Sequence, residues 1–183
     1  EYKINNKHKD FSLNLKIALS ELDLKNQELL KNFFPKINEE LTLKDHQIEV
    51  NYSKNNLSFE GFGKIKLEKE FDKIDYSISK IDNKFNFNTI FDLDQTFFKI
   101  DYLNYKKSKK LNTQLVILGS YEKNNELSLE KISVQDKDNK IILKNLLLDS
   151  DNKIMKVEKI DLNYVDRENK RNEFFLTRKN KNN

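Results

Sequence analysis

The sequence contains no cysteine and no tryptophan, and it has only one proline and three glycines in 183 residues. Without cysteine the chain has no disulfide framework, no thiolate metal site and no cysteine nucleophile. Its longest apolar runs, such as Leu115–Leu118 and Leu146–Leu148, fall far short of the roughly 20 residues that a membrane-spanning helix needs. These absences exclude several common classes of site and leave the redox compartment open.

An excess of one charge is also missing. The chain has 34 basic and 30 acidic residues, and arginine occurs only at Arg167, Arg171 and Arg178. Surfaces that bind nucleic acid usually use arginine and separate basic from acidic side chains, whereas lysine and acidic residues alternate here over short distances. We therefore expect no nucleic-acid partner. Because the sequence begins at Glu1, we take it to be an excerpt of a longer chain.

Apolar and polar residues alternate along most of the sequence, which is the pattern of a strand with one buried face. The alternation begins with Phe11–Leu19 and returns from Ile48 onward. It is interrupted between Asn26 and Pro35, where Leu29–Leu30 and Phe33–Phe34 recur at helical spacing. The sequence therefore predicts many strands and one short helix, near residues 26–34, which we expect to lie across one end of the sheet.

Asp and Asn residues, which suit tight turns, separate the apolar segments, and the tripeptide Asp-Asn-Lys occurs at 82–84, 138–140 and 151–153. Short connections between long alternating segments predict an all-β fold, a long antiparallel meander that forms a curved, twisted β-groove sheet. The alternation shifts by one residue after Tyr102 and between Leu129 and Ile132, which predicts β-bulges that curl the sheet. We assign residues 1–10 to an N-terminal extension, 11–178 to a single β-groove segment and 179–183 to a polar tail.

The apolar face of such a sheet must be hidden from water. It can close into a barrel, pack against a second sheet, or stay open and be covered by a ligand. With so few Gly and Pro residues a sandwich is disfavoured, and an outer-membrane barrel would need a girdle of interfacial aromatics. We therefore favour the hypothesis of an open groove. The residues that would line it are Phe59, Ile65, Ile74, Tyr76, Ile78, Phe85, Phe87, Phe91, Phe98, Ile100, Leu115, Ile117 and Leu129.

No motif points to catalysis, a cofactor or a metal. Gly61-Phe62-Gly63 lacks the third glycine of a dinucleotide loop and is better explained by a strand that bends or is closely approached by a neighbour. His8 and His46 have no second ligand nearby and are expected at the surface. Ser120 lacks a nucleophile context, and Asp136–Asn139 is expected to be a hairpin turn and not a calcium loop. We therefore expect a protein that is not an enzyme.

Three features together resemble a known family: the segment that ends in Phe33-Phe34-Pro35, the strand Gly61-Phe62-Gly63-Lys64-Ile65, and the meander that follows. From about Phe11 to Arg178 the chain resembles the AsmA-like family of bacterial envelope proteins, the group that includes TamB and YhdP. The resemblance implies a β-groove in the periplasm of a diderm bacterium, tethered to the inner membrane by a helix outside this excerpt, and a part in outer-membrane biogenesis. The excerpt is shorter than these proteins, and we expect the anchor helix to lie outside it.

Two functions are compatible with these patterns. The first is a lipid-binding or lipid-transfer module of a bridge-like protein, in which phospholipid acyl chains lie along the apolar rows and pass between inner and outer membrane. The second is a structural or interaction β-array of the cell envelope, with a closed core, no ligand, and edge strands that pair with adjacent β modules.

Overall fold

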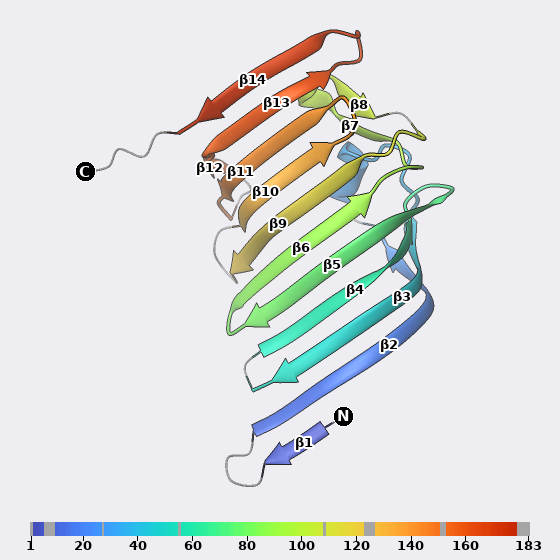
Figure 1. Ribbon diagram of the computed structural model, residues 1–183, viewed down its shortest axis with the longest axis vertical. Helices are drawn as coiled ribbons and strands as arrows, with labels where there is room; N and C mark the ends of the chain where they lie inside the picture. Colours follow the sequence, from blue (N-terminus) through green and yellow to red (C-terminus); the bar gives the residue numbers. More distant parts are fainter. Residues whose placement is uncertain are drawn as a thin grey trace, which may run out of the picture.

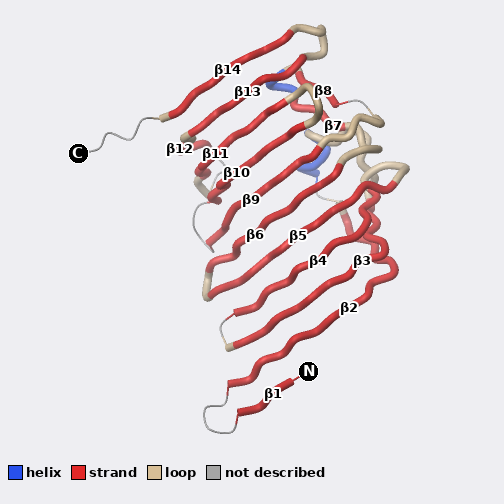
Figure 2. Tube along the Cα trace, in the orientation of Figure 1, coloured by secondary structure: helices blue, strands red, loops and turns tan. Residues whose placement is uncertain are grey.

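Almost the whole chain is β-structure in the computed structural model of the protein, which describes residues 2–5, 10–26, 28–54, 56–107, 109–122, 127–150 and 153–178. Figure 2 shows how little of it is helical. Every strand pair is antiparallel, and the main sheet begins at β1 and ends at β14 without closing on itself. The prediction of an all-β antiparallel meander is confirmed.

Neighbours along the chain are also neighbours in the sheet, apart from one excursion between β6 and β9 (Figure 1). The main sheet has the order β1-β2-β3-β4-β5-β6-β9-β10-β11-β13-β14, and β12 pairs with β11. Its strands are β1 (Tyr2–Asn5), β2 (Asp10–Lys25), β3 (Glu40–Ser53), β4 (Asn56–Lys66), β5 (Phe71–Ile81), β6 (Lys84–Asp92), β9 (Gln114–Glu122), β10 (Leu127–Gln135), β11 (Lys140–Leu148), β12 (Ile154–Lys156), β13 (Lys159–Val165) and β14 (Arg171–Thr177).

The register places the apolar residues of successive strands side by side on one face, which we call the apolar face, because residues directly opposite each other point to the same side. They form rows that cross the sheet. The tip row is Leu13, Tyr52, Leu57, Lys80, Phe85, Tyr121, Leu127 and Leu148; the second row is Leu15, Val50, Phe59, Ile78, Phe87, Gly119, Leu129 and Leu146; the capped row includes Ile74, Phe91, Leu115, Val134, Ile141 and Leu162.

A small layer, the cap, covers this face at one end of the strands only. It consists of the 3-10 helix η1 (Glu28–Asn32), the hairpin β7 (Phe98–Ile100) and β8 (Tyr105–Lys107), and the 3-10 turn η2 (Asp101–Leu103) between them. In Figure 1 the hairpin lies at the end of the sheet opposite the arrowheads of β3, β5 and β9. The buried core lies between the cap and the sheet, with residues from both, and comprises Phe34, Ile37, Leu41, Ile65, Leu67, Ile74, Leu93, Phe98, Tyr105, Leu115, Val134, Ile141 and Tyr164.

Buried polar groups hold the cap on the sheet. The carboxylate of Asp72 on β5 accepts hydrogen bonds from the backbone N–H groups of Asp94 (2.7 Å), Gln95 (2.7 Å) and Thr96 (3.0 Å). Lys107 of β8 donates to the carbonyls of Asp94 (3.1 Å) and Thr96 (2.9 Å). Because a buried charge is tolerated only where hydrogen bonds compensate its desolvation, these contacts fix the loop that leads from β6 into the cap.

Two local expectations need correction. The helix expected near residues 26–34 is only the short 3-10 segment η1, closed by N–H groups of Phe33 and Phe34 that donate to Leu30 O; so short a segment cannot nucleate an α-helix without help from packing. It does lie against the core, through Leu30 and Phe34. The shift of alternation after Tyr102 is not a bulge, because β7 ends at Ile100 and Tyr102 lies in the 3-10 turn η2. The bulge expected beside Leu129 is confirmed.

A second bulge, absent from the sequence expectations, lies in β3. The pairing of β3 with β4 shifts between Lys44 and Gln47, where Asp45 has a φ of 55°. His46 follows the alternation of Ile48, Val50 and Tyr52 onto the apolar face, where it is fully buried, and the bulge returns Leu43 to the same face. The expectation that His46 lies at the surface is therefore wrong, because its position in the alternation with Ile48 and Val50 places it on the apolar face. His8 lies outside the described residues.

Candidate functional site

The apolar face is half covered and half open. Ile74 and Ile78 lie on the same face of β5, yet Ile74 is 8% exposed and Ile78 is 40% exposed. The cap packs over Ile74, whereas in the described structure no second layer packs over Ile78. The strand tips away from the cap therefore present large apolar side chains to solvent.

We call this uncovered area the open surface. It is formed by the tip row and the second row on β2, β3, β4, β5, β6 and β9, together with Ile17 beside them on β2. Its exposed members are Leu15, Ile17, Tyr52, Ile78, Phe85 and Tyr121, and its half-buried members include Leu13, Val50, Leu57, Phe59 and Phe87. A contiguous apolar area of this kind is unusual on a soluble monomer and marks a contact site for a ligand, a membrane or another protein.

The residues predicted to line a groove are divided between the open surface and the core. Ile78 and Phe85 are exposed, and Phe59, Tyr76, Phe87, Phe91 and Ile117 are half-buried. Ile65, Ile74 and Leu115 are buried beneath the cap, and Leu129 is buried within the second row. Phe98 and Ile100 do not lie on the sheet at all, because the chain leaves it after β6 and they form part of the covering hairpin.

Several members of the open surface were not among the predicted lining residues. Leu15 and Ile17 of β2 and Val50 and Tyr52 of β3 line it as fully as the residues of β5 and β6. The alternation in Phe11–Leu19 was a visible signal for the first pair. What the sequence could not show was that β2 and β3 continue the same rows across the sheet.

The rim of the open surface carries apolar side chains with polar ends. In the tip row, Tyr52 and Tyr121 are exposed, and Lys80 places its ammonium group 5.5 Å from the centre of the Phe85 ring. Lysine and tyrosine can cover apolar surface with their stems and rings while their polar ends stay in water. The rim therefore suits a boundary between an apolar ligand and solvent.

The inner limit of the open surface is set by buried His46 and half-buried Tyr76. His46 Nε2 lies 2.9 Å from Lys64 O, and because a carbonyl can only accept, Nε2–H is the donor. His46 Nδ1 lies 3.3 Å from the Tyr76 hydroxyl, whose pKa is raised by burial. Both rings need the two glycines of β4: a Cβ at Gly61 would lie 2.6 Å from Tyr76 Cζ, and one at Gly63 would lie 2.6 Å from His46 Cγ. The expected close approach of a neighbour at these glycines is confirmed.

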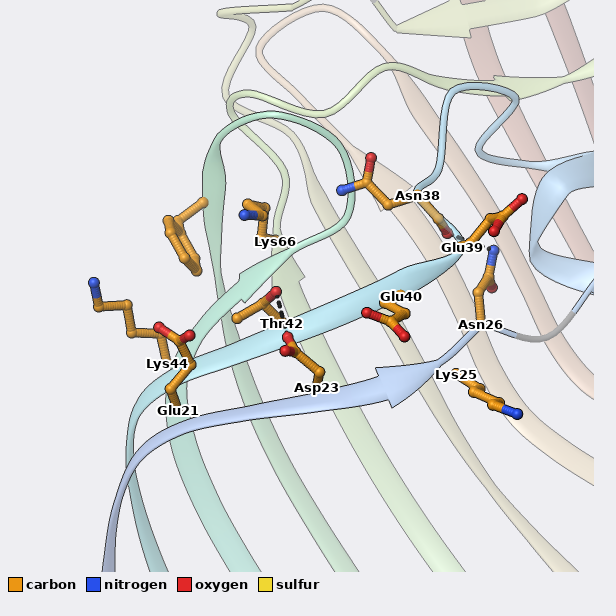
Figure 3. A pocket seen from close by; sticks show the side chains of 11 residues that line it. Glu21, Asp23, Lys25, Asn26, Asn38, Glu39, Glu40, Thr42, Lys44 and Lys66 are labelled. Atoms are coloured by element: carbon orange, nitrogen blue, oxygen red, sulfur yellow. Dashed lines mark hydrogen bonds between the residues drawn. The ribbon is translucent and has the colours of Figure 1, made fainter.

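A polar pocket lies on the opposite, polar face, at the capped end (Figure 3). Its volume is about 810 Å³, and Thr42 Oγ1 donates to Asp23 across its floor at 2.7 Å. Acidic and basic side chains are intermixed among the residues that line it. These residues are Glu21, Asp23, Lys25, Asn26, Asn38, Glu39, Glu40, Thr42, Lys44, Lys66 and Phe71. Opposite charges that neighbour one another in this way leave little net field for a charged ligand.

Comparison of the chain with protein-family models, with curated proteins and with solved structures found no match. Within the described residues, no helix is long and apolar enough to cross a membrane. The same residues contain no cluster of three or more His, Cys, Asp or Glu side chains that could hold a metal ion. The open surface therefore remains the feature of the molecule that most needs a functional explanation.

Proposed function

We propose that the open surface binds the acyl chains of lipids. Its residues form two parallel rows of aliphatic and aromatic side chains, without a charged residue other than Lys80 at the rim. A surface of this kind offers no directional polar partner, so the ligand it fits best is itself apolar and extended. Burial of about 25 cal/mol per Å² of apolar surface would supply the binding free energy.

The observation that carries the proposal is the contrast between the two ends of one face. Evenly spaced apolar rows run the full length of the strands, but the cap covers only the rows nearest to it. A protein that needed only a core would gain by covering both ends. An uncovered continuation of the core rows is the arrangement expected where a ligand completes the second layer.

The wider setting remains a prediction. A place in the periplasm, a tether to the inner membrane and transfer of phospholipid toward the outer membrane rest on the resemblance to AsmA-like proteins. Acyl-chain binding by the open surface can be tested independently of the location, the tether and the transfer between membranes.

The test is to purify the protein without detergent, extract it and identify bound lipid by mass spectrometry, then to titrate the delipidated protein with a fluorescent fatty acid. Ile78→Glu should abolish binding of the probe, because it places a charge among the apolar rows. Ser79→Glu, one residue away on the polar face, is the matched control. A folded protein that carries no lipid and does not bind the probe would contradict the proposal, as would equal probe binding by the two variants.

The alternative, a structural β-array, is favoured by the enclosed core beneath the cap, where Ile74, Leu115 and Val134 are almost wholly buried. If the open end is likewise closed by a second protein, the purified chain should associate through it. A hydrophobic dye separates the two functions. A monomer that binds the dye has an open apolar surface, as lipid binding requires. An oligomer that does not bind the dye has this surface covered by protein, as the structural function requires.

A further inference from the structure

Three lysines lie directly opposite one another on the polar face of the C-terminal strands. Lys131 of β10 pairs with Lys144 of β11, and Lys144 pairs with Lys159 of β13. Opposed residues in adjacent antiparallel strands have Cβ atoms only about 4.5–5.5 Å apart, and like charges in this position are destabilising. Three lysines side by side on adjacent strands therefore lower the stability of the fold.

Nearby carboxylates do not neutralise the first two. Asp161 contacts Lys140 (2.9 Å) and Lys159 (3.7 Å), and Glu158 is engaged by Lys156 and Asn145. In the described part of the chain neither Lys131 nor Lys144 has an acidic partner within salt-bridge distance. The lysine row, as we call Lys131, Lys144 and Lys159, thus has an acidic partner at Lys159 and, within the described residues, none at its other two members.

Further along the same row the charges are mixed. Followed through the register across β9, β6 and β5, the position of the lysine row reaches Glu60 on β4, Glu49 on β3 and Lys16 on β2. The uncharged positions on β9, β6 and β5 separate the three lysines from the acidic residues of this row. The C-terminal strands, which lie together in Figure 1, therefore carry a local positive field that the net charge of +4 does not reveal.

Large apolar side chains are exposed beside the lysines. Phe175 of β14 is 65% exposed on the polar face, and Lys159 Nζ lies 5.2 Å from the centre of its ring. On β12, Ile154 and Met155 are also exposed, next to Lys156. Lysines that flank exposed aliphatic and aromatic residues are the combination found where proteins rest on a membrane surface.

We infer that the lysine row and Phe175 form a docking surface for an anionic lipid bilayer. The lysines would contact lipid phosphate groups, and Phe175 would enter the head-group region. This surface lies on the opposite side of the sheet from the open surface, so docking leaves the open surface free and does not depend on whether it holds acyl chains.

The test is co-sedimentation of the full chain with phosphatidylcholine vesicles and with vesicles that also contain phosphatidylglycerol. Binding should require phosphatidylglycerol and should fall as salt rises, because the Debye length shortens from about 30 Å at 0.01 M to about 8 Å at 0.15 M. Lys131→Gln with Lys144→Gln should weaken binding about 30-fold, the value expected for two lysines near an anionic surface. The matched control is Lys69→Gln with Lys106→Gln, which removes the same charge at the capped end and should retain binding.

A further readout separates docking from a structural role. Because the substitutions relieve repulsion between opposed lysines, the urea midpoint of Lys131→Gln with Lys144→Gln should stay the same or rise while vesicle binding is lost. Phe175→Ser should weaken vesicle binding without any change in salt dependence. The fatty-acid probe used for the open surface should bind these variants as it binds the parent, so that failure of one proposal is distinguishable from failure of the other.

Three results would overturn the inference. Equal binding to neutral vesicles, or equal loss in the control pair, would remove the role of the lysine row. Tighter binding to RNA or polyphosphate than to the anionic vesicles would assign the row to a soluble polyanion. A dimer at low salt that the lysine substitutions dissociate, with no vesicle binding, would assign it to Glu49 and Glu60 of a second copy.

Discussion

The imidazole of His46 lies directly against Gly63 on the neighbouring strand, with no room for a side chain between them. An alanine at this position would meet a fully buried ring that is held by Lys64 O and by the Tyr76 hydroxyl. The ring cannot move away without breaking these hydrogen bonds. The glycine is therefore required by packing, since its φ is not in the left-handed region.

Gly63→Ala should lower the free energy of unfolding by about 1–3 kcal/mol, the usual result of overpacking a core. Urea denaturation measures it, with Ser58→Ala on the polar face of the same strand as control. In a His46→Ala background, the same substitution should have a much smaller effect, since the clash is gone. Additive effects of the two substitutions would contradict the packing explanation.

Asp72→Asn should destabilise the cap by about 3 kcal/mol, because three backbone N–H groups would then face an amide with only one acceptor oxygen and without negative charge. Hydrogen exchange at Gln95 and Thr96 should accelerate most. Asp75→Asn, an exposed change on the same strand, is the control. If both variants exchange alike at Gln95 and Thr96, the carboxylate does not hold the loop.

Ile74→Ala and Ile78→Ala compare the two ends of one strand face. Ile74 is enclosed, and its truncation should cost about 2–5 kcal/mol through lost burial and a cavity. Ile78 is 40% exposed, and its truncation should cost less than half as much. Thermal or urea unfolding of the two variants side by side measures the difference. Equal losses would mean that the open surface is enclosed in solution.

Alkaline pH should destabilise the protein partly through Tyr105. Burial, with the nearby Asp136 carboxylate as a lesser cause, raises the pKa of the Tyr105 hydroxyl above its ordinary value near 10. The unfolded phenol therefore ionises first, so this contribution to stability is complete below about pH 10 and is lost as pH rises above it, by up to about 1.4 kcal/mol per pH unit.

The comparison is between Tyr105→Phe and the parent in urea at pH 8 and pH 11. The variant should lose less stability over this interval than the parent does. Tyr121→Phe, which alters an exposed tyrosine of the tip row, serves as control. A parent and a Tyr105→Phe variant with the same pH dependence would show that the buried phenol does not control alkaline unfolding.

The alternation of residues such as Ile74, Tyr76 and Ile78 was sufficient to predict strands, because period two is a local property of the backbone. Turn residues such as Asp82 and Asn83 likewise predicted where the chain reverses, and short turns lead to antiparallel neighbours. The shift between Leu129 and Ile132 predicted a bulge for the same reason. These features depend only on residues close together in the chain.

The excursion into the cap could not be predicted in this way. Phe98, Ile100 and Tyr102 alternate as well as any strand of the main sheet, but Asp72, more distant in the sequence, holds the loop that takes this segment out of it. Their alternation correctly predicted a strand, but it could not predict which sheet that strand joins. The burial of His46 escaped prediction because it depends on the space left by Gly63 and on hydrogen bonds to Lys64 and Tyr76 of other strands.

Composition and alternation by themselves determined that this chain is a β meander with one apolar and one charged face. Only the tertiary structure decided that the apolar face is covered over Ile74 and open over Ile78, and that lysines from three strands meet on the other face. The physical reason is that strand periodicity comes from neighbouring residues, whereas coverage and cross-strand register come from contacts between distant ones.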